Sequence, residues 1–150
     1  DQETARIAVQ AALTGHLVLS TLHTHDAPGA IARLIDLGVE PFLVASSLSA
    51  VLAQRLVRTV HQSCTGRGCA ECLGMGFKGR TGVFELLVLE DSIRRLVTSR
   101  ASADVIKTRA VELGMVPLRM AGAKLVRDGV TTAAEVARVI EALDKEDLTA

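Results

Sequence analysis

A short segment rich in cysteine and glycine constrains the fold of this chain more than any other feature. All three cysteines lie between Cys64 and Cys72, and residues 61–82 hold six of the twelve glycines. An odd number of cysteines this close together does not suit the disulfide framework of a secreted domain, whereas it suits metal ligation in a reducing compartment. We therefore expect residues 61–82 to be irregular and ordered by something other than an apolar core.

The candidate metal ligands His61, Cys64, Cys69 and Cys72 form the pattern H-x2-C-x4-C-x2-C. Ligands separated by two residues can both turn inward on one knuckle, and two facing knuckles offer Zn²⁺ a closed, structural tetrahedron. The alternative is a group of free surface thiols, with His61 merely ending a helix. The gap between the pairs is short, since zinc ribbons commonly use about 15–20 residues. Either residues are missing after Cys64 or the loop is naturally trimmed.

Composition excludes several classes of protein. Lys plus Arg and Asp plus Glu each number 17, so the overall charge does not direct the chain to nucleic acid or to an anionic membrane. The apolar stretches are shorter than the roughly 18 residues of a membrane span, and no secretory signal is recognisable. We expect a cytosolic protein of one domain that can carry a small subdomain. The opening residues already have a helical pattern, so we also expect coding sequence upstream of Asp1.

The hydrophobic pattern predicts an α/β fold, because a helix followed by a short apolar strand is typical of an α/β sheet. Asp26 and Pro28 mark one helix start, and Thr132 with Glu135 forms a capping box at another. The expected strands span 16–21 and 83–89. The expected helices span 2–13, 27–37, 41–58, 91–99, 102–114, 117–129 and 132–143, followed by a frayed tail.

Three histidines surround the first expected strand. His16 starts it, and His23 and His25 follow its end, where ligands usually bind in an α/β sheet. A neutral imidazole at His23 would report a bound phosphate through one hydrogen bond. The alternative is that each histidine only satisfies nearby backbone groups. Several arginines have the same two interpretations, as phosphate or carboxylate ligands or as solvated helix ends: Arg33, Arg55, Arg58 and Arg80.

Two runs of sequence resemble a known family. These are ETARIAVQAALTGHLVLSTLHTHDAPGAIARLIDLGVEPFLVASSLSAVLAQRLVR and GCAECLGMGFKGRTGVFELL. They are similar to the ATPases of type II secretion and type IV pilus assembly, a branch of the hexameric RecA-like motors. The resemblance covers nearly all of residues 1–90, whereas residues 91–150 match only in helical character.

The resemblance implies a division of the chain into three parts. Residues 1–60 would form the carboxyl half of a RecA-like P-loop NTPase core, residues 61–80 a zinc-binding insert, and residues 81–150 a strand with a mainly helical subdomain. It places His16 and His23 in the family's histidine box as catalytic residues. It makes three further residues candidates for binding the nucleotide: Arg33, Gln54 and Arg55.

The same resemblance implies ATP, Mg²⁺ and structural Zn²⁺ as cofactors. It implies a homo-hexamer at the cytoplasmic face of the inner membrane, acting on the platform proteins of the machine. Two residues depart from the family pattern: His61 stands where a cysteine is usual, and His25 where Asn is more common. The phosphate loop G-x-x-x-x-G-K-[ST] does not occur in these residues, so we expect the chain alone not to hydrolyse ATP.

Two other functions remain as alternatives. One is a stand-alone zinc-binding module for protein interaction; a nucleic-acid partner is disfavoured because the chain has three Phe and no Tyr or Trp for stacking. A glycine-rich phosphate loop in the upstream coding sequence would favour the motor. A start codon immediately upstream of Asp1 would favour the module. The other is a related motor for pilus retraction or DNA uptake, which the cysteine pair disfavours because retraction motors generally lack it.

Overall fold

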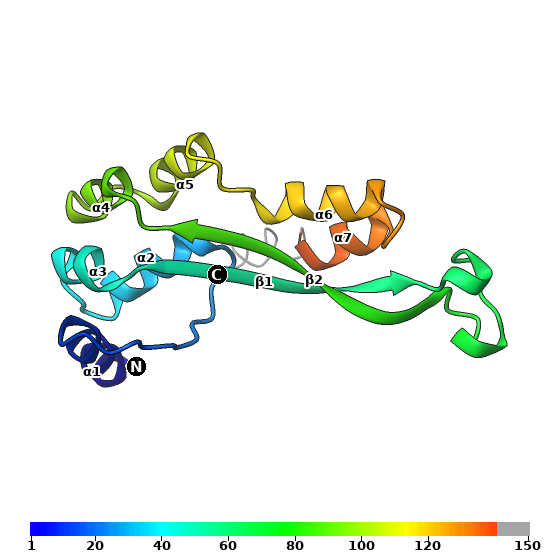
Figure 1. Cartoon of the computed structure of the whole chain (residues 1–150), viewed down its shortest axis with the longest axis horizontal. Helices are drawn as coiled ribbons and strands as arrows, with labels where there is room; N and C mark the ends of the chain where they lie inside the picture. The colour runs from blue at the N-terminus through cyan, green and yellow to red at the C-terminus, as the bar shows by residue number, and fades with distance from the viewer. Residues whose placement is uncertain (141–150) are drawn as a thin grey trace. The chain divides into compact units, whose positions relative to one another are not determined.

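Two paired strands on either side of the cysteine segment organise the structure, a computed structural model that describes residues 1–140 (Figure 1). β1 (Ala50–Val60) and β2 (Phe77–Val88) form a two-stranded sheet. The Leu89 NH donates to the Ser49 carbonyl beyond one end, and the His61 NH donates to the Gly76 carbonyl beyond the other. The strands are therefore antiparallel.

The chain divides into two compact units. Unit 1 comprises Asp1–Ala53 and Glu85–Met115, and unit 2 comprises Gln54–Phe84 with the chain from Val116 onward. Both strands cross this division, so each strand contributes residues to both units. Side chains alternate along the strands as a one-sided sheet requires: Ala53, Val57, Val83 and Leu87 are buried, whereas Leu52, Leu56, Phe84 and Leu86 are exposed.

Unit 1 is a cluster of helices around an aliphatic core. α3 packs on α1, α2 and α4, while α5 packs on α2 and α4. Its fully buried side chains include Ile31, Val44, Leu87, Ile93 and Ile106. The helices are α1 (Gln2–Leu13), α2 (Ala27–Asp36), α3 (Pro41–Ser47), α4 (Asp91–Thr98) and α5 (Ala103–Glu112).

Charged side chains fix the start of α2. Asp26 caps the helix by accepting from the Gly29 NH at 2.9 Å. The buried Glu85 carboxylate accepts from the Ala27 NH at 2.8 Å, where the positive end of the helix dipole favours an anion. Lys107 on α5 lies 2.9 Å from the second Asp26 oxygen, and this contact raises the pKa of the lysine. Three elements distant in sequence therefore meet at one helix terminus.

Unit 2 contains the helix pair α6 (Leu118–Arg127) and α7 (Ala133–Ile140). It also contains Gln54–Phe84, the part of the β1–β2 hairpin that includes the cysteine segment. Gly122 allows the helices to approach, because a Cβ there would lie 2.7 Å from Val136 Cγ1. Glu135 of α7 is buried and accepts from the Arg58 backbone NH at 3.1 Å and from its guanidinium at 2.6 Å. This contact ties α7 to β1.

The capped helices confirm the sequence predictions, and two other elements correct them. The expected strand 16–21 is irregular, with Leu17 and Leu19 89% and 87% exposed, because no strand of the described residues pairs with it. The expected helix 41–58 ends at Ser47, and residues 50–60 form β1 instead. Leu52 and Leu56 satisfy a four-residue helical spacing as well as strand alternation, which caused the error.

The predicted capping box is half formed. The Glu135 NH donates to Thr132 Oγ1 at 3.2 Å, but the Glu135 carboxylate is engaged by Arg58 and Arg138. The last residues of the helix expected over 132–143, and the tail after it, lie outside the described residues.

Candidate functional site

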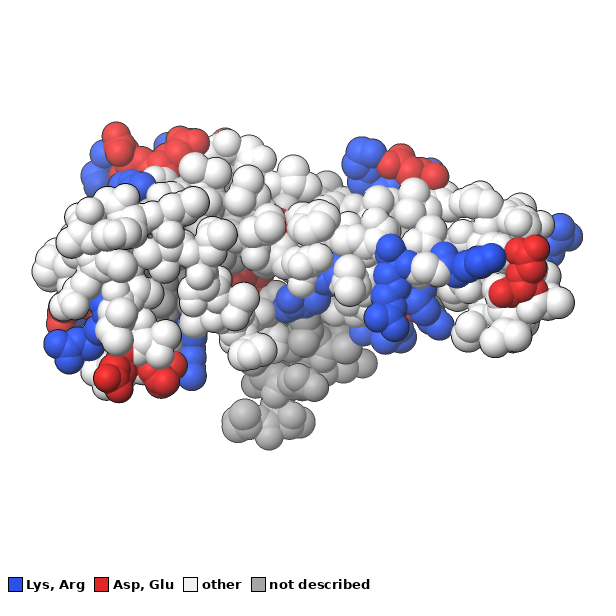
Figure 2. All heavy atoms as spheres, turned by 60° about the horizontal axis from the view of Figure 1, so that its bottom comes forward, with Lys and Arg blue, Asp and Glu red and all other residues white. Residues whose placement is uncertain are grey.

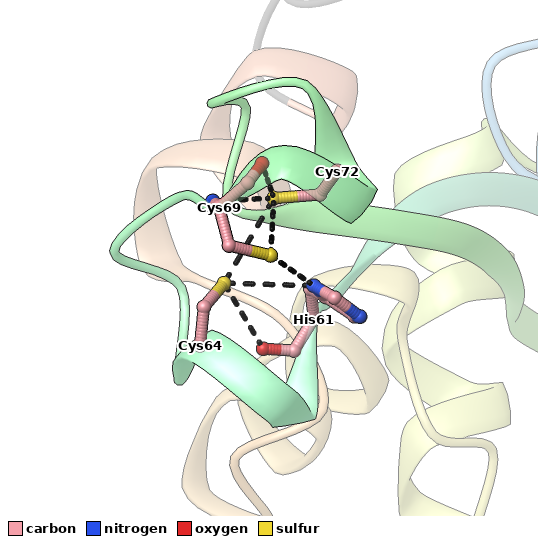
Figure 3. Close-up of side chains that lie close together, drawn as sticks. All are labelled: His61, Cys64, Cys69 and Cys72. Atoms are coloured by element: carbon pink, nitrogen blue, oxygen red, sulfur yellow. Dashed lines mark hydrogen bonds between the residues drawn. The ribbon is translucent and has the colours of Figure 1, made fainter.

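Four side chains of the cysteine segment converge on one point (Figure 3). The ligand atoms of His61, Cys64, Cys69 and Cys72 all lie within 4.8 Å of one another. Cys72 Sγ lies 3.8 Å from Cys64 Sγ and 3.7 Å from Cys69 Sγ, and His61 Nδ1 lies 3.6 and 3.4 Å from the sulfurs of Cys64 and Cys69. The structure thus brings together all four residues that the pattern singled out.

These distances fit the edges of a metal tetrahedron. Bonds of about 2.3 Å to sulfur and 2.0–2.1 Å to nitrogen give edges of about 3.8 Å between sulfurs and about 3.6 Å from sulfur to nitrogen. The observed separations lie close to those values. Three sulfurs and one imidazole nitrogen also form the soft donor set that suits Zn²⁺, with no position left for water.

Two single-turn helices present the ligands. η1 (Gln62–Cys64) follows β1 and carries Cys64, and η2 (Ala70–Cys72) follows Cys69 and carries Cys72. The backbone reverses after each turn, at Thr65 (φ +49°) and Leu73 (φ +52°). The knuckle geometry inferred from the two-residue spacing is therefore present.

Two glycines let the two turns lie against each other. A Cβ at Gly76 would lie 2.2 Å from the Gly66 carbonyl oxygen, and a Cβ at Gly68 would lie 2.6 Å from that of Gly74. No side chain fits at either position without moving backbone. The glycines of this segment thus serve close backbone approach, as well as turn geometry.

Backbone donors favour a thiolate at Cys72. Burial works to raise the pKa of this thiol, but the NH groups of Cys69 and Gly76 donate to its sulfur at 3.2 and 3.3 Å and outweigh it, so the pKa is lowered to about 6. A low thiol pKa is the protonation behaviour that a metal ligand needs, because the thiolate is the ligand.

The candidate catalytic histidines lie in unit 1 and are exposed. His16 Nδ1 lies 3.0 Å from Thr14 Oγ1 and 3.3 Å from the Ala11 carbonyl, so this ring interacts with the end of α1. His23 lies in the irregular segment before α2 and forms no hydrogen bond or ion pair within residues 1–140. Their catalytic role stays a prediction.

The candidate nucleotide ligands are divided between the units. Arg33 is exposed near the end of α2 in unit 1, whereas Gln54 and Arg55 lie on β1 in unit 2. Arg55 donates to the Gln54 carbonyl at 2.8 Å. Their role in binding nucleotide also stays a prediction.

Sequence reasoning missed two carboxylates. Glu71 stands between two ligand cysteines, and its carboxylate lies 3.3 Å from His61 Nε2. Glu135 was interpreted only as a helix cap, although it is the buried acceptor for Arg58 and Arg138. The position of Glu71 inside the C-x-x-C turn was the available signal, whereas the partner of Glu135 is distant in sequence.

The zero net charge of the chain conceals an uneven distribution. The described acidic residues of unit 2 are Glu71, Asp128 and the buried Glu135. In the right half of Figure 2, basic side chains gather on the surface with few acidic ones among them. The described basic residues of unit 2 are Arg55, Arg58, Arg67, Lys78, Arg80, Arg119, Lys124, Arg127 and Arg138. In the described residues, no helix is both long and apolar enough to cross a bilayer.

Comparison with known proteins identifies the family. The family model described as "Type II/IV secretion system protein" matches residues 1–138. The chain belongs to this secretion-system family. The resemblance stated from the sequence is therefore confirmed.

The curated relatives of this family that match the chain include proteins 42–49% identical to it. The type II secretion system protein HxcR of Pseudomonas aeruginosa is 49% identical, covering 93% of this chain and 31% of HxcR. The type IV pilus assembly ATPase TfpB of Acinetobacter baylyi is 44% identical, covering 93% of this chain and 28% of TfpB. The chain thus spans about 30% of the length of these relatives.

The fold is similar to solved structures of the ATPases PilT and DotB. The pilus retraction motor PilT with bound ADP matches with a TM-score of 0.71 at 25% identity, covering 92% of this chain and 36% of PilT. The ATPase DotB of Yersinia pseudotuberculosis matches with a TM-score of 0.70 at 21% identity, covering 94% and 34%. The mixed α/β class expected from the sequence is confirmed.

Proposed function

We propose that this chain is part of a motor ATPase that drives type II protein secretion or type IV pilus assembly. The observation that carries the proposal is the family match over residues 1–138, together with relatives named for those two machines. That match extends far beyond residues 61–80. A stand-alone zinc-binding interaction module is therefore the weaker explanation.

The proposed motor belongs to the RecA-like P-loop class and uses ATP and Mg²⁺. The candidates His16, His23 and Arg33 belong to unit 1 and Gln54 and Arg55 to unit 2, and residues 1–150 contain no phosphate loop. We therefore assign nucleotide binding to the full-length protein and derive no catalytic step from this chain. His16 and His23 are proposed to respond to the nucleotide, and Arg33, Gln54 and Arg55 to contact phosphate or a neighbouring subunit.

The resemblance further supports a working assembly for the full-length protein. It would be a homo-hexamer, cytoplasmic and peripheral at the inner membrane, with the platform proteins of the machine as partners and no nucleic acid. The proposed division of labour is a nucleotide core over residues 1–60, a zinc-binding insert over 61–80 and a helical subdomain over 81–150. This is a division by role, whereas the two compact units are defined by packing.

We propose that the insert holds one structural Zn²⁺ through His61 Nδ1 and the sulfurs of Cys64, Cys69 and Cys72. The edge lengths and the soft donor set support this assignment. A closed Zn²⁺ site contributes folding free energy to a segment that has few apolar side chains of its own. Metal analysis of protein purified without chelator should find about one zinc per chain; finding none would contradict the proposal.

The motor proposal is tested with the full-length protein. Purified protein should hydrolyse ATP, and a strain that lacks it should lose either secretion or pili. Loss of secretion with normal pili assigns the secretion machine, and the reverse assigns pilus assembly. A full-length protein without a phosphate loop, without ATP hydrolysis and with neither defect would instead favour the interaction module.

A further inference from the structure

The two ring nitrogens of His61 face different partners. Nδ1 is directed at the sulfurs of Cys64 and Cys69, at 3.6 and 3.4 Å (Figure 3). Nε2 lies 3.3 Å from a Glu71 carboxylate oxygen. The imidazole is 7% exposed, whereas the Glu71 side chain is 64% exposed, so the carboxylate reaches the buried ring from the surface.

This arrangement selects one tautomer of the imidazole. A metal bound at Nδ1 needs the lone pair of that nitrogen, which leaves the ring proton on Nε2. A carboxylate at Nε2 accepts that proton in a hydrogen bond, fixes the ring plane and makes the other nitrogen a better donor. The Glu71 oxygen lies 3.3 Å from Nε2, within reach of such a hydrogen bond.

We propose that Glu71 is a positioning residue for the metal centre, holding His61 as an Nδ1 ligand. The inference rests on the proposed zinc site and assigns a role to a residue outside the ligand set. Glu71 belongs to η2, the turn between Cys69 and Cys72. The turn that carries two thiolates therefore also orients the ligand that comes from the end of β1.

Charge supports the same role. Three thiolates and Zn²⁺ together carry one negative charge, and a neutral imidazole adds none, whereas a fourth thiolate would add another. The Glu71 carboxylate supplies this additional negative charge from outside the ligand set, at the far nitrogen of the His61 ring. Lys78 Nζ on β2 lies 3.4 Å from the same Glu71 oxygen, a solvent-exposed contact that favours this position of the carboxylate only weakly.

The test measures zinc affinity of the full-length protein by competition with a chromophoric chelator at fixed pH. Glu71→Ala should weaken binding about 10- to 100-fold, the usual loss for a residue that orients a ligand histidine. Glu71→Gln keeps an acceptor oxygen and should lose less. Glu112→Ala removes a carboxylate of similar exposure, paired with Arg109 at 2.8 Å on α5, and should leave affinity unchanged.

A double-mutant cycle separates orientation from simple charge. In a His61→Cys background there is no ring to orient, so adding Glu71→Ala should change zinc affinity by less than about twofold. An equal loss in both backgrounds would overturn the proposal, because Glu71 would then act only through its charge. Wild-type protein that binds no zinc would instead refute the metal site itself, and wild-type affinity in Glu71→Ala would refute the role of Glu71 alone.

A spectroscopic measurement covers the case in which His61→Cys does not fold. Histidine ring ¹⁵N–¹H correlation spectra of the zinc-loaded wild-type protein should show His61 protonated at Nε2. A proton on Nδ1, or zinc bound through Nε2, would overturn the proposal irrespective of any affinity.

Discussion

The cysteine insert (residues 61–76) and the histidine segment (residues 16–25) both carry sequence motifs, but only the insert brings its candidate residues together in the structure. In residues 61–76 four candidate side chains meet within 4.8 Å, held by two short turns. In residues 16–25 the backbone is irregular, and both candidate histidines are exposed. The cysteine motif thus supplies all the side chains of its candidate site, whereas the histidine motif does not do so within the described residues.

The two segments differ in how far away in the sequence their interaction partners lie. The ligands of the insert lie within twelve residues of sequence, so two turns suffice to bring them together. A strand such as the one predicted over residues 16–21 needs hydrogen bonds from another strand, and unsatisfied backbone groups must otherwise face water. Leu17 and Leu19 accordingly lie almost fully exposed. A local pattern thus predicts a local site better than it predicts a strand.

The largest expected effect is loss of the metal ligand Cys72. Its sulfur accepts two backbone NH groups and the residue is 2% exposed, so Cys72→Ser should weaken zinc binding at least about a thousandfold, or about 4 of the roughly 10–16 kcal/mol that a structural site provides. Hydrogen exchange should rise across residues 61–76. His16→Ala is the matched change in the other region and should leave both measurements as they are; any shared effect would break the contrast.

A smaller effect is expected at Glu135, whose partner Arg58 is far away in sequence. Glu135→Ala leaves the Arg58 NH without its acceptor and should lower the free energy of unfolding by about 2–3 kcal/mol, because both arginine partners remain partly solvated. Denaturant unfolding measures this. Asp128→Ala removes an exposed pair with Lys124 and should cost less than about 1 kcal/mol. Equal losses of unfolding free energy in the two variants would show that the buried Glu135 contact stabilises the fold no more than an exposed ion pair.

The same carboxylate predicts a pH dependence. The side chains of Arg138 and Arg58 hold the pKa of Glu135 well below its usual value of 4.5. Its contribution is therefore fully present above about pH 4.5 and is lost as the pH falls toward the folded-state pKa. Wild-type protein should lose stability more steeply below pH 4.5 than Glu135→Gln, in unfolding measured across that range; parallel curves would contradict this assignment.

An effect of intermediate size in the full-length motor is expected at His23. If His23 responds to the nucleotide, His23→Ala should slow ATP turnover about tenfold, near 1.4 kcal/mol of barrier, while nucleotide binding changes less. Steady-state kinetics and direct binding separate the two. Lys124→Ala serves as a surface control. An unaltered turnover would remove His23 from the mechanism and leave the histidine segment without an assigned role.

The smallest effect is expected at Leu17. At 89% exposure, Leu17→Ser should change the unfolding free energy of this chain by no more than about 0.5 kcal/mol. The same substitution in the full-length protein sharpens the comparison. A loss above about 2 kcal/mol there would mean that residues 16–21 are buried in the larger protein, as a core strand would be.

Much of the fold followed from local signals, and the failures have physical causes. Asp26 and Pro28 mark the start of α2 because capping chemistry is decided within one turn. Residues 50–58 were assigned to a helix because Leu52 and Leu56 satisfy both periodicities, and only pairing with β2 decides between them. The convergence of His61, Cys64, Cys69 and Cys72 was predictable from spacing, and their role as metal ligands stays a prediction. Glu71 and Glu135 were not assigned these roles, since their partners are set by how turns and helices pack.

The shared strands have a consequence for how this sequence can change. Ala53 and Leu87 fill the core of unit 1, and Val57 and Val83 fill that of unit 2, all on the same two strands. A deletion of one residue within either strand would shift the register of that strand and turn its side chains on one side of the deletion to the opposite face. Length changes between the strands, in residues 61–76, leave that register untouched. Insertions and deletions in this hairpin are therefore expected to accumulate around the metal ligands rather than in the ladder.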